Sequence, residues 1–239
     1  NQVEPGGLSV QTVAQLQALL DSHPQTVFDV RRSRWQIDTE NPKSIWLRDN
    51  RTLIMDSATV IESSVVIPST VKQPYQNESI TGYGALLTVA GHNISVLGGR
   101  FEQPVTSLDC TFAKPIHAGA CNFAIDVFKS TAVRLRDSVV QGSFQSSVRV
   151  QQDRGVPSGT APSVSQWSTL PGLAKQPVFI TNITLLHHSN SSLFQLRGFW
   201  LVTAQNVFLT RNTVFRPFMY SIDIGSSSSA NLVHNNWMK

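Results

Sequence analysis

The chain has 239 residues, a formal net charge of +4 and a hydrophobic fraction of 41%, and only 14% of its residues are charged. This length suffices for one substantial core, and the low charge content favours extensive sheet over charged surface helices. No basic run predicts nucleic-acid binding, no apolar stretch approaches the roughly 18 residues of a membrane span, and no cluster of Asp predicts a metal site.

One helix is predicted, over residues 9–23. Ser9 is the N-cap candidate, and Pro24 ends the helix. The apolar positions at helical spacing are Val10, Val13, Leu16, Leu19 and Leu20.

After residue 24 the apolar period falls to two, which predicts short strands separated by Gly, Asn, Asp and Ser. Five segments share one shape, in which a strand, a short pivot and a second strand follow one another. The pivots are Gly98, Asp137, Asn182, Asn212 and Asn236. These residue types tolerate the left-handed backbone of a sharp bend, and a repeat of about 20–30 residues is typical of a β-solenoid.

This pattern resembles the pectin-lyase-like superfamily of secreted carbohydrate-active proteins. The matching stretches are 12–30 as a capping helix and first strand, 46–61 as a coil and 85–101 as the next coil. The resemblance implies an all-β fold, a right-handed parallel β-helix with three sheets and an N-terminal capping helix, as one domain over 1–239. It also implies that a substrate groove lies on the sheet containing "SSVRVQQ" (146–152).

Two insertions interrupt the predicted coils, at 103–121 and 152–177. We expect both to border the same sheet, either as walls of a groove or as surface decoration. The last coil ends at "NNWMK" without a predicted cap. An uncapped solenoid end exposes strand edges, so we expect self-association there or a continuation of the chain, as after a truncation.

Aligning the recurring strand by its inward apolar pairs predicts an outward polar row. The chosen pairs are Leu87/Val89, Ile125/Val127, Val148/Val150, Phe194/Leu196 and Ile222/Ile224. The outward residues between them are Thr88, Asp126, Arg149, Gln195 and Asp223, and the next outward positions are Ala90, Phe128, Gln151, Arg197 and Gly225. Parallel pairing spaces the members of such a row by about 4.8 Å.

The row supplies the candidate site. Its catalytic candidates are Arg149, Asp126 and Lys129, and its substrate-binding candidates are Gln195, Arg197, Asp223, Gln151 and Trp167. Arginine matches the geometry of a carboxylate, and a tryptophan can stack on a sugar. The alternative is a solvated cross-strand pair worth at most about 1 kcal/mol. On either interpretation, replacing Arg149 is expected to leave folding nearly intact.

Lyase or epimerase chemistry suits these residues better than hydrolysis. Glycoside hydrolysis needs two carboxyl groups about 5–9 Å apart, whereas Asp126 and Asp223 lie about three coils, roughly 14 Å, apart. The motifs of polygalacturonase-type hydrolases are absent. An acid, a base and a positive group suffice for a lyase. Of the histidines, His187 and His188 fall on another sheet, and His117 falls in the first insertion.

Sequons and cysteines favour export from a eukaryotic cell. The N-x-S/T asparagines are Asn50, Asn77, Asn93, Asn182 and Asn190. Cys110 and Cys121 would form a disulfide in a secreted chain and would be free thiols in a cytosolic one. A chain that begins at Asn1 fits removal of a signal peptide or excision of a fragment. We expect N-linked glycans and no other cofactor.

Two functional interpretations remain open at this point. The first is a secreted β-helix that binds or modifies an acidic polysaccharide, by lyase or epimerase chemistry if it is catalytic. The second is a non-catalytic structural glycoprotein of an extracellular wall or fibre, which assembles through the open solenoid end.

Overall fold

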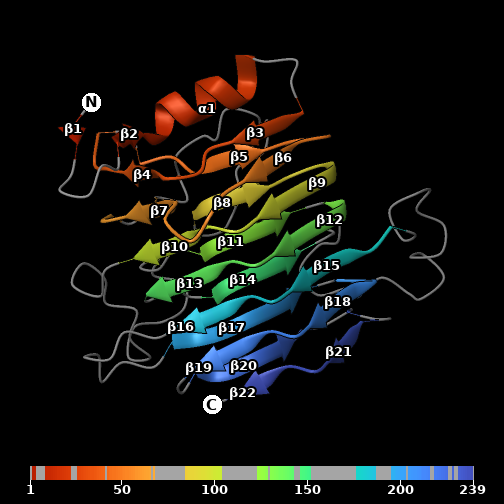
Figure 1. Ribbon diagram of the computed structural model, residues 1–239. Coiled ribbons are helices and arrows are strands. Elements are labelled where there is room, and N and C mark those ends of the chain that lie inside the picture. The colour runs from red at the N-terminus through yellow and green to blue at the C-terminus, as the bar shows by residue number, and fades with distance from the viewer. Residues whose placement is uncertain are drawn as a thin grey trace.

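Three stacked sheets with parallel strands make up the protein, in the topology of a parallel β-helix (Figure 1). The computed structural model describes residues 2–3, 9–22, 26–40, 42–65, 67, 84–103, 123–128, 130–142, 146–151, 176–186, 195–202, 204–215, 218–225, 228 and 231–238. Within these ranges, the side chains of 2–3, 9–10, 22, 195–196 and 218–219 are outside the description.

The three sheets are called A, B and C here. Sheet A contains, in spatial order, β1 (Gln2–Val3), β2 (Ser9–Thr12), β4 (Ser33–Ile37), β7 (Val60–Ser63), β10 (Arg100–Gln103), β13 (Val139–Gly142), β16 (Thr184–Leu186), β19 (Thr213–Phe215) and β22 (Trp237–Met238). Sheet B contains β3 (Val27–Asp29), β6 (Thr52–Ile54), β9 (His92–Leu97), β12 (Thr131–Arg136), β15 (Val178–Thr181), β18 (Val207–Thr210) and β21 (Leu232–His234). Sheet C contains β5 (Ile45–Leu47), β8 (Ala85–Val89), β11 (Phe123–Phe128), β14 (Ser146–Gln151), β17 (Gln195–Val202) and β20 (Phe218–Ile224).

From β5 onward the chain visits sheets C, B and A in turn, so each set of three strands is one coil. Neighbouring coils pair in parallel, and the antiparallel pair β1–β2 at the start is the exception among the described pairs. The predicted order of strand, bend and strand is therefore confirmed. The sequence pattern did not predict β4, in which buried and half-buried residues alternate and Trp35 and Ile37 are buried.

The inward side chains of all three sheets form one apolar core. Ile125, Val148 and Phe199 from sheet C, at most 1% exposed, pack with Val96 and Leu135 from sheet B and with residues of sheet A. In the interior, the apolar side chains of one coil thus stack on the apolar side chains of the next. This continuous burial is what holds the outward side chains in register.

The helix α1 (Val13–Ser22) lies at the N-terminal end of the stack (Figure 1). Its residues Val13, Leu16 and Leu20 join the core. The helix begins later than predicted, because the backbone of β2 pairs with β4. Ser9 is therefore not its N-cap. Instead, Thr12 and Gln15 exchange backbone–side chain hydrogen bonds of 3.3 and 3.0 Å, a capping box.

The bend between sheets B and A is left-handed in most coils. Gly98, Asp137 and Asn182 have positive φ, as predicted, but in the last two coils the left-handed residues are Arg211 and Asn235. Each lies one position before the predicted pivots Asn212 and Asn236. Where two polar residues follow an apolar strand, as in Arg211–Asn212 and Asn235–Asn236, the sequence does not show which of the two adopts the left-handed backbone and which points inward.

Asn212 is the inward member of this pair and is fully buried. Its Oδ1 accepts from the backbone N–H of Ile183 (2.9 Å), and its Nδ2 donates to the carbonyl of Ile180 (3.1 Å). Its Nδ2 also donates to Oδ1 of Asn236 (2.9 Å) in the next coil. The side chain thus satisfies backbone groups that the sheet ladder leaves unpaired at the bend.

Candidate binding face on sheet C

The outward face of sheet C carries one row of side chains that spans all six of its strands. The register places Trp46, Thr88, Asp126, Arg149, Trp200 and Asp223 level with one another. The predicted neighbours Thr88, Asp126 and Arg149 therefore stand together on adjacent strands. Trp46 and Trp200 are members that the sequence alignment missed.

Gln195 does not stand in this row. The inward pair of β17 is Phe199 and Leu201, rather than Phe194 and Leu196, so Trp200 is level with Arg149. Arg197 is level with Ser146 instead of Gln151. The segment "FQLRGFWLV" (194–202) offers two alternating apolar pairs, and the core takes the second. At Gly198, a Cβ would approach the core residue Leu185 to 3.1 Å, so this position faces inward.

A local change of face adds an aromatic residue to the site. Ala124 and Ile125 are consecutive, yet both lie in the core, so strict alternation fails at this point of β11. Phe123 consequently shares the outward side with Asp126 and is fully buried there. Leu86 and Leu87 repeat the same feature one coil earlier. Strict alternation places Phe123 in the interior, which is why the sequence did not predict its contact with the row.

Asp126 and Arg149 form a buried, bidentate ion pair. Nε of Arg149 donates to Oδ1 of Asp126 (2.9 Å), and its Nη2 donates to Oδ2 (2.6 Å). Each side chain is only 6% exposed. The guanidinium carbon lies 4.0 Å from the centroid of the Phe123 ring, a cation–π contact. Arg149 is therefore held by protein groups in this structure, and its removal is no longer expected to leave folding intact.

A second pair, one coil further on, is more open. Nε of Arg197 donates to Oδ2 of Asp223 (2.5 Å), with 15% and 26% of the two side chains exposed. The Arg197 guanidinium lies 4.3 Å from the centroid of the Trp200 ring. Its Nη1 is buried without a hydrogen-bond partner. Tyr220, level with Arg197, is 44% exposed.

The remaining predicted site residues contribute less to the described face. Gln151 is half-buried at the end of β14, level with Phe128 and Val202. The side chain of Gln195 is not described. Lys129, Trp167, Cys110, Cys121, His117, His187, His188, Asn77 and Asn190 lie outside the described residues, as do almost all of the segments 103–121 and 152–177.

The three described sequon asparagines are all exposed and have a left-handed backbone, Asn50 and Asn182 between strands and Asn93 near the start of β9. Asn93 donates from its amide to Oδ1 of Asn50 (3.1 Å), and Asn182 donates in the same way to Asp137 (2.8 Å). The two asparagines thus take part in ladders between coils while remaining at the surface.

A pocket of about 430 Å³ opens beside the N-terminal end of the same row. It lies between α1 and the bend after β5 and includes Trp46 in its wall. The other lining residues are Leu20, Asp21, Arg48, Asp49 and Arg51. Its charges of both signs suit a polar occupant.

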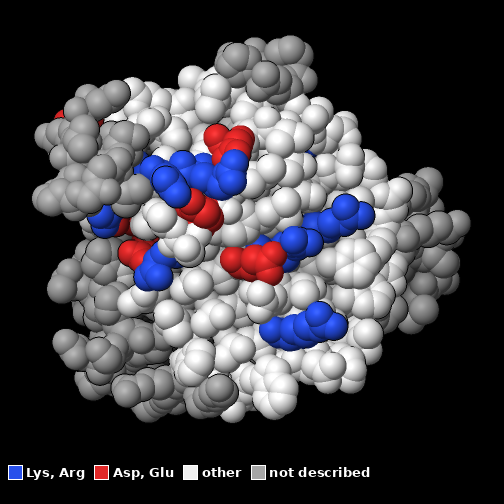
Figure 2. Space-filling model, in the orientation of Figure 1, with Lys and Arg blue, Asp and Glu red and all other residues white. Residues whose placement is uncertain are grey.

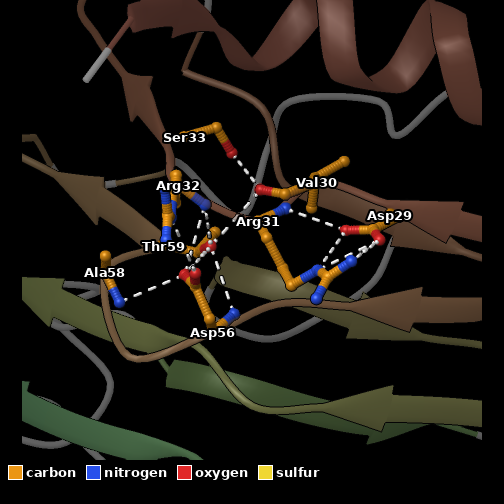
Figure 3. Close-up of polar contacts among 8 residues, drawn as sticks. All are labelled: Asp29, Val30, Arg31, Arg32, Ser33, Asp56, Ala58 and Thr59. Carbon is orange, nitrogen blue, oxygen red and sulfur yellow. Dashed lines mark hydrogen bonds and ion pairs between the residues drawn. The ribbon is translucent and has the colours of Figure 1, made fainter. Parts of the chain in front are cut away.

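A separate polar cluster occupies the first two bends between sheets B and A (Figure 3). Asp56 accepts hydrogen bonds from the hydroxyl of Thr59 (2.8 Å) and from the backbone N–H groups of Arg32 (3.2 Å) and Ala58 (3.1 Å). Burial acts to raise the pKa of Asp56, but these hydrogen bonds outweigh it and hold the pKa below its ordinary value. Nearby, the hydrogen bond from Arg31 lowers the pKa of Asp29. Since its partners come from the bends themselves, we interpret the cluster as structural.

Stability is expected to fall in acid through Asp56. A carboxyl whose pKa is lowered on folding stabilises the native state above its unfolded pKa of about 3.9, and this contribution disappears as the pH falls through the lower folded value. The melting temperature of the wild-type protein should therefore drop more between about pH 5 and pH 3 than that of Asp56→Asn. Identical acid profiles for the two proteins would contradict this role.

Further ion pairs lie on sheet A, where Arg34 contacts Glu62 (2.8 Å) and Arg100 contacts Glu102 (2.6 Å). Figure 2 shows basic side chains beside acidic ones in the upper left and the centre of one face. Within the described ranges, no group of three or more His, Cys, Asp or Glu could hold a metal ion. The one described helix is too short and too polar to cross a bilayer.

Comparison with known proteins adds no relative. No protein-family model matches the sequence, and neither a curated protein nor a solved structure matches it. The class of the molecule therefore rests on the sheets themselves, which define a parallel β-helix topology.

Proposed function

We propose that this chain is a secreted, N-glycosylated right-handed parallel β-helix of the pectin-lyase-like kind, with α1 as its N-terminal cap, that binds an acidic polysaccharide across the outward face of sheet C. One observation carries the proposal. Two arginines on successive strands, Arg149 and Arg197, each lie against an aromatic ring and an aspartate on the same outward face of sheet C, and the second of these pairs is partly exposed.

The more exposed pair is the better contact for a ligand. Arg197 donates to Asp223 through Nε, and 15% of its side chain is exposed against 6% for Arg149, so its guanidinium is the more accessible of the two to a uronate carboxylate. Trp200 and Tyr220 supply the aromatic surface beside it, as sugar recognition requires. A polysaccharide that runs across the strands would meet side chains of successive strands at intervals of about 4.8 Å, the spacing between paired strands.

Binding suits the described face better than catalysis. A lyase or epimerase needs a base and an acid that reach the substrate. Asp126 is bound on both oxygens by Arg149 in a buried site, and no histidine lies on the described face of sheet C. Activity, if present, would have to involve further groups such as Lys129 or the two insertions.

The test compares polyuronate binding by wild-type protein and Arg197→Ala. Loss of charge-assisted hydrogen bonds worth about 1.5–3 kcal/mol should weaken binding roughly 10- to 100-fold, measured by calorimetry or affinity electrophoresis. Arg134→Ala, which removes an exposed arginine from sheet B, is the matched control and should bind normally. Methyl-esterified polymer, which lacks the free carboxylates, should bind weakly to both the wild-type protein and Arg134→Ala. Equal affinity of wild type and Arg197→Ala would exclude this face, and the same samples report unsaturated products if a lyase is present.

The structural-glycoprotein alternative has its own observation. The last coil exposes several large apolar side chains, which suits assembly through this end of the solenoid. In that case the protein would assemble without binding any polyuronate.

A further inference from the structure

We propose that the pocket between α1 and the bend after β5 binds a small polyhydroxylated carboxylic acid, such as a sugar acid. This is a second site, separate from the polysaccharide face proposed above. Trp46 belongs to both the pocket and the row on sheet C. However, Thr88, Asp126 and Arg149 of that row are at most 5% exposed, so the row does not join the pocket to Arg197 as one open surface.

The pocket has the size of a small-molecule site. Its volume is about 430 Å³, within the range of roughly 300–1,000 Å³ that such sites occupy. Leu20 and Trp46, both 3% exposed, form its apolar wall. The other described lining residues are all charged, so the pocket offers an apolar surface to a carbon skeleton and polar groups beside it.

One side chain of α1 joins the two walls of the pocket. Gln17 accepts a hydrogen bond from the backbone N–H of Trp46 (2.7 Å) and donates to the Trp46 carbonyl (3.2 Å). The same amide nitrogen donates to Oδ1 of Asp21 (3.1 Å). Because β5 is the last described strand at this edge of sheet C, Gln17 takes the place of a neighbouring strand and holds α1 beside it (Figure 1). The walls are thus fixed before a ligand arrives, which favours binding.

The two aspartates of the pocket can accept hydrogen bonds from hydroxyl groups. Oδ1 of Asp49 accepts from the backbone N–H of His92 (2.6 Å), and Oδ1 of Asp21 accepts from Gln17. A carboxylate has two oxygens with about four acceptor positions. Since both aspartates are exposed, each can accept from a ligand hydroxyl in addition to its protein donor.

Arg48 and Arg51 supply the donors that a carboxylate requires. Both also interact with other protein groups, and the guanidinium carbon of Arg51 lies 5.7 Å from the centroid of the Phe28 ring. A guanidinium carries five N–H donors, so it can serve a protein partner and a ligand together. Two positive and two negative lining groups therefore favour an anion that also carries hydroxyl donors over a simple anion.

NMR titration of the isotope-labelled chain with gluconate tests the site. Gluconate should bind saturably and shift the backbone amide signals of residues 20–21 and 46–51. Sorbitol has the same carbon chain and hydroxyls without the carboxylate, and hexanoate has a carboxylate without hydroxyls. Each should bind at least about 10-fold more weakly. Arg48→Gln should weaken gluconate binding by a similar factor, and circular dichroism confirms that this variant folds, as its exposed position allows.

Arg211→Gln is the matched control, because Arg211 is also exposed and lies between β18 and β19, far along the stack from α1. Its affinity for gluconate should equal that of the wild-type protein. Absence of saturable gluconate binding overturns the proposal, and so does equal binding of sorbitol or hexanoate. Wild-type affinity in both Arg48→Gln and Arg51→Gln overturns it as well. If Arg197→Ala alone weakened gluconate binding, the acid would bind on sheet C, and the pocket would be excluded while the polysaccharide face stood.

Discussion

Replacing Arg149 with Ala is expected to lower the free energy of unfolding by about 3–5 kcal/mol. The substitution leaves the carboxylate of Asp126 buried, with both of its charge-assisted hydrogen bonds removed, at a position where 6% of the side chain is exposed. It also removes the guanidinium that covers the ring of Phe123. Urea unfolding followed by circular dichroism measures the change.

Two controls separate burial from simple loss of an ion pair. Arg136→Ala breaks an exposed pair with Asp137, whose side chains are 60% and 45% exposed, and should cost less than about 1 kcal/mol. Replacing both buried partners with apolar residues, Asp126→Leu with Arg149→Met, should recover much of the loss. If Arg149→Ala cost as little as Arg136→Ala, the pair would be solvated in solution and available to a ligand.

Asn212→Ala is the second substitution with a large expected effect, a loss on the order of 3 kcal/mol. The alanine orphans the buried N–H of Ile183 and carbonyl of Ile180 together with the contact to Asn236, and each unsatisfied buried group costs about 1–3 kcal/mol. Thermal and urea unfolding both report the change.

Asn231→Ala is the matched control for this prediction. Asn231 makes the same kind of bonds, accepting from Val207 N–H (3.0 Å) and donating to the carbonyl of Ala204 (3.0 Å), but it is half-buried in the last coil. Water can replace its bonds, so the loss should be clearly smaller. Equal losses of unfolding free energy in Asn212→Ala and Asn231→Ala would mean that burial of the asparagine does not determine how much its hydrogen bonds stabilise the fold.

Much of the coil architecture could be predicted from residues. Gly, Asp and Asn at recurrent bends identified the turn between sheets B and A, because few other residues adopt a left-handed backbone cheaply. Arg211 shows the limit of this signal, since it has a φ of 58° although arginine is not a residue type that favours a left-handed backbone. The helix boundary was wrong for a similar reason: residues 9–12 have a helical apolar pattern, but pairing with β4 takes them into sheet A.

The candidate site was predictable in its centre and not at its margins. Asp126 and Arg149 sit between unambiguous apolar pairs, so period-two alignment placed them side by side, as the register confirms. β17 has two possible pairs, and a wrong choice moved Gln195 into the place of Trp200. Burial of the ion pair could not be predicted either. Period-two alternation identifies which residues point outward, but it does not show whether solvent or other side chains such as Phe123 cover them.

The asymmetry between the two ends of the stack has a dynamic consequence. Each coil is stabilised by the coils next to it. Near the N-terminus α1 packs Leu16 and Leu20 into the core, whereas β20, β21 and β22 each pair with one described strand only. In this 239-residue chain, local opening should therefore begin at β20–β22 and proceed coil by coil toward α1. Backbone amide hydrogens should exchange with solvent fastest in that terminal coil and slowest in the middle of the stack.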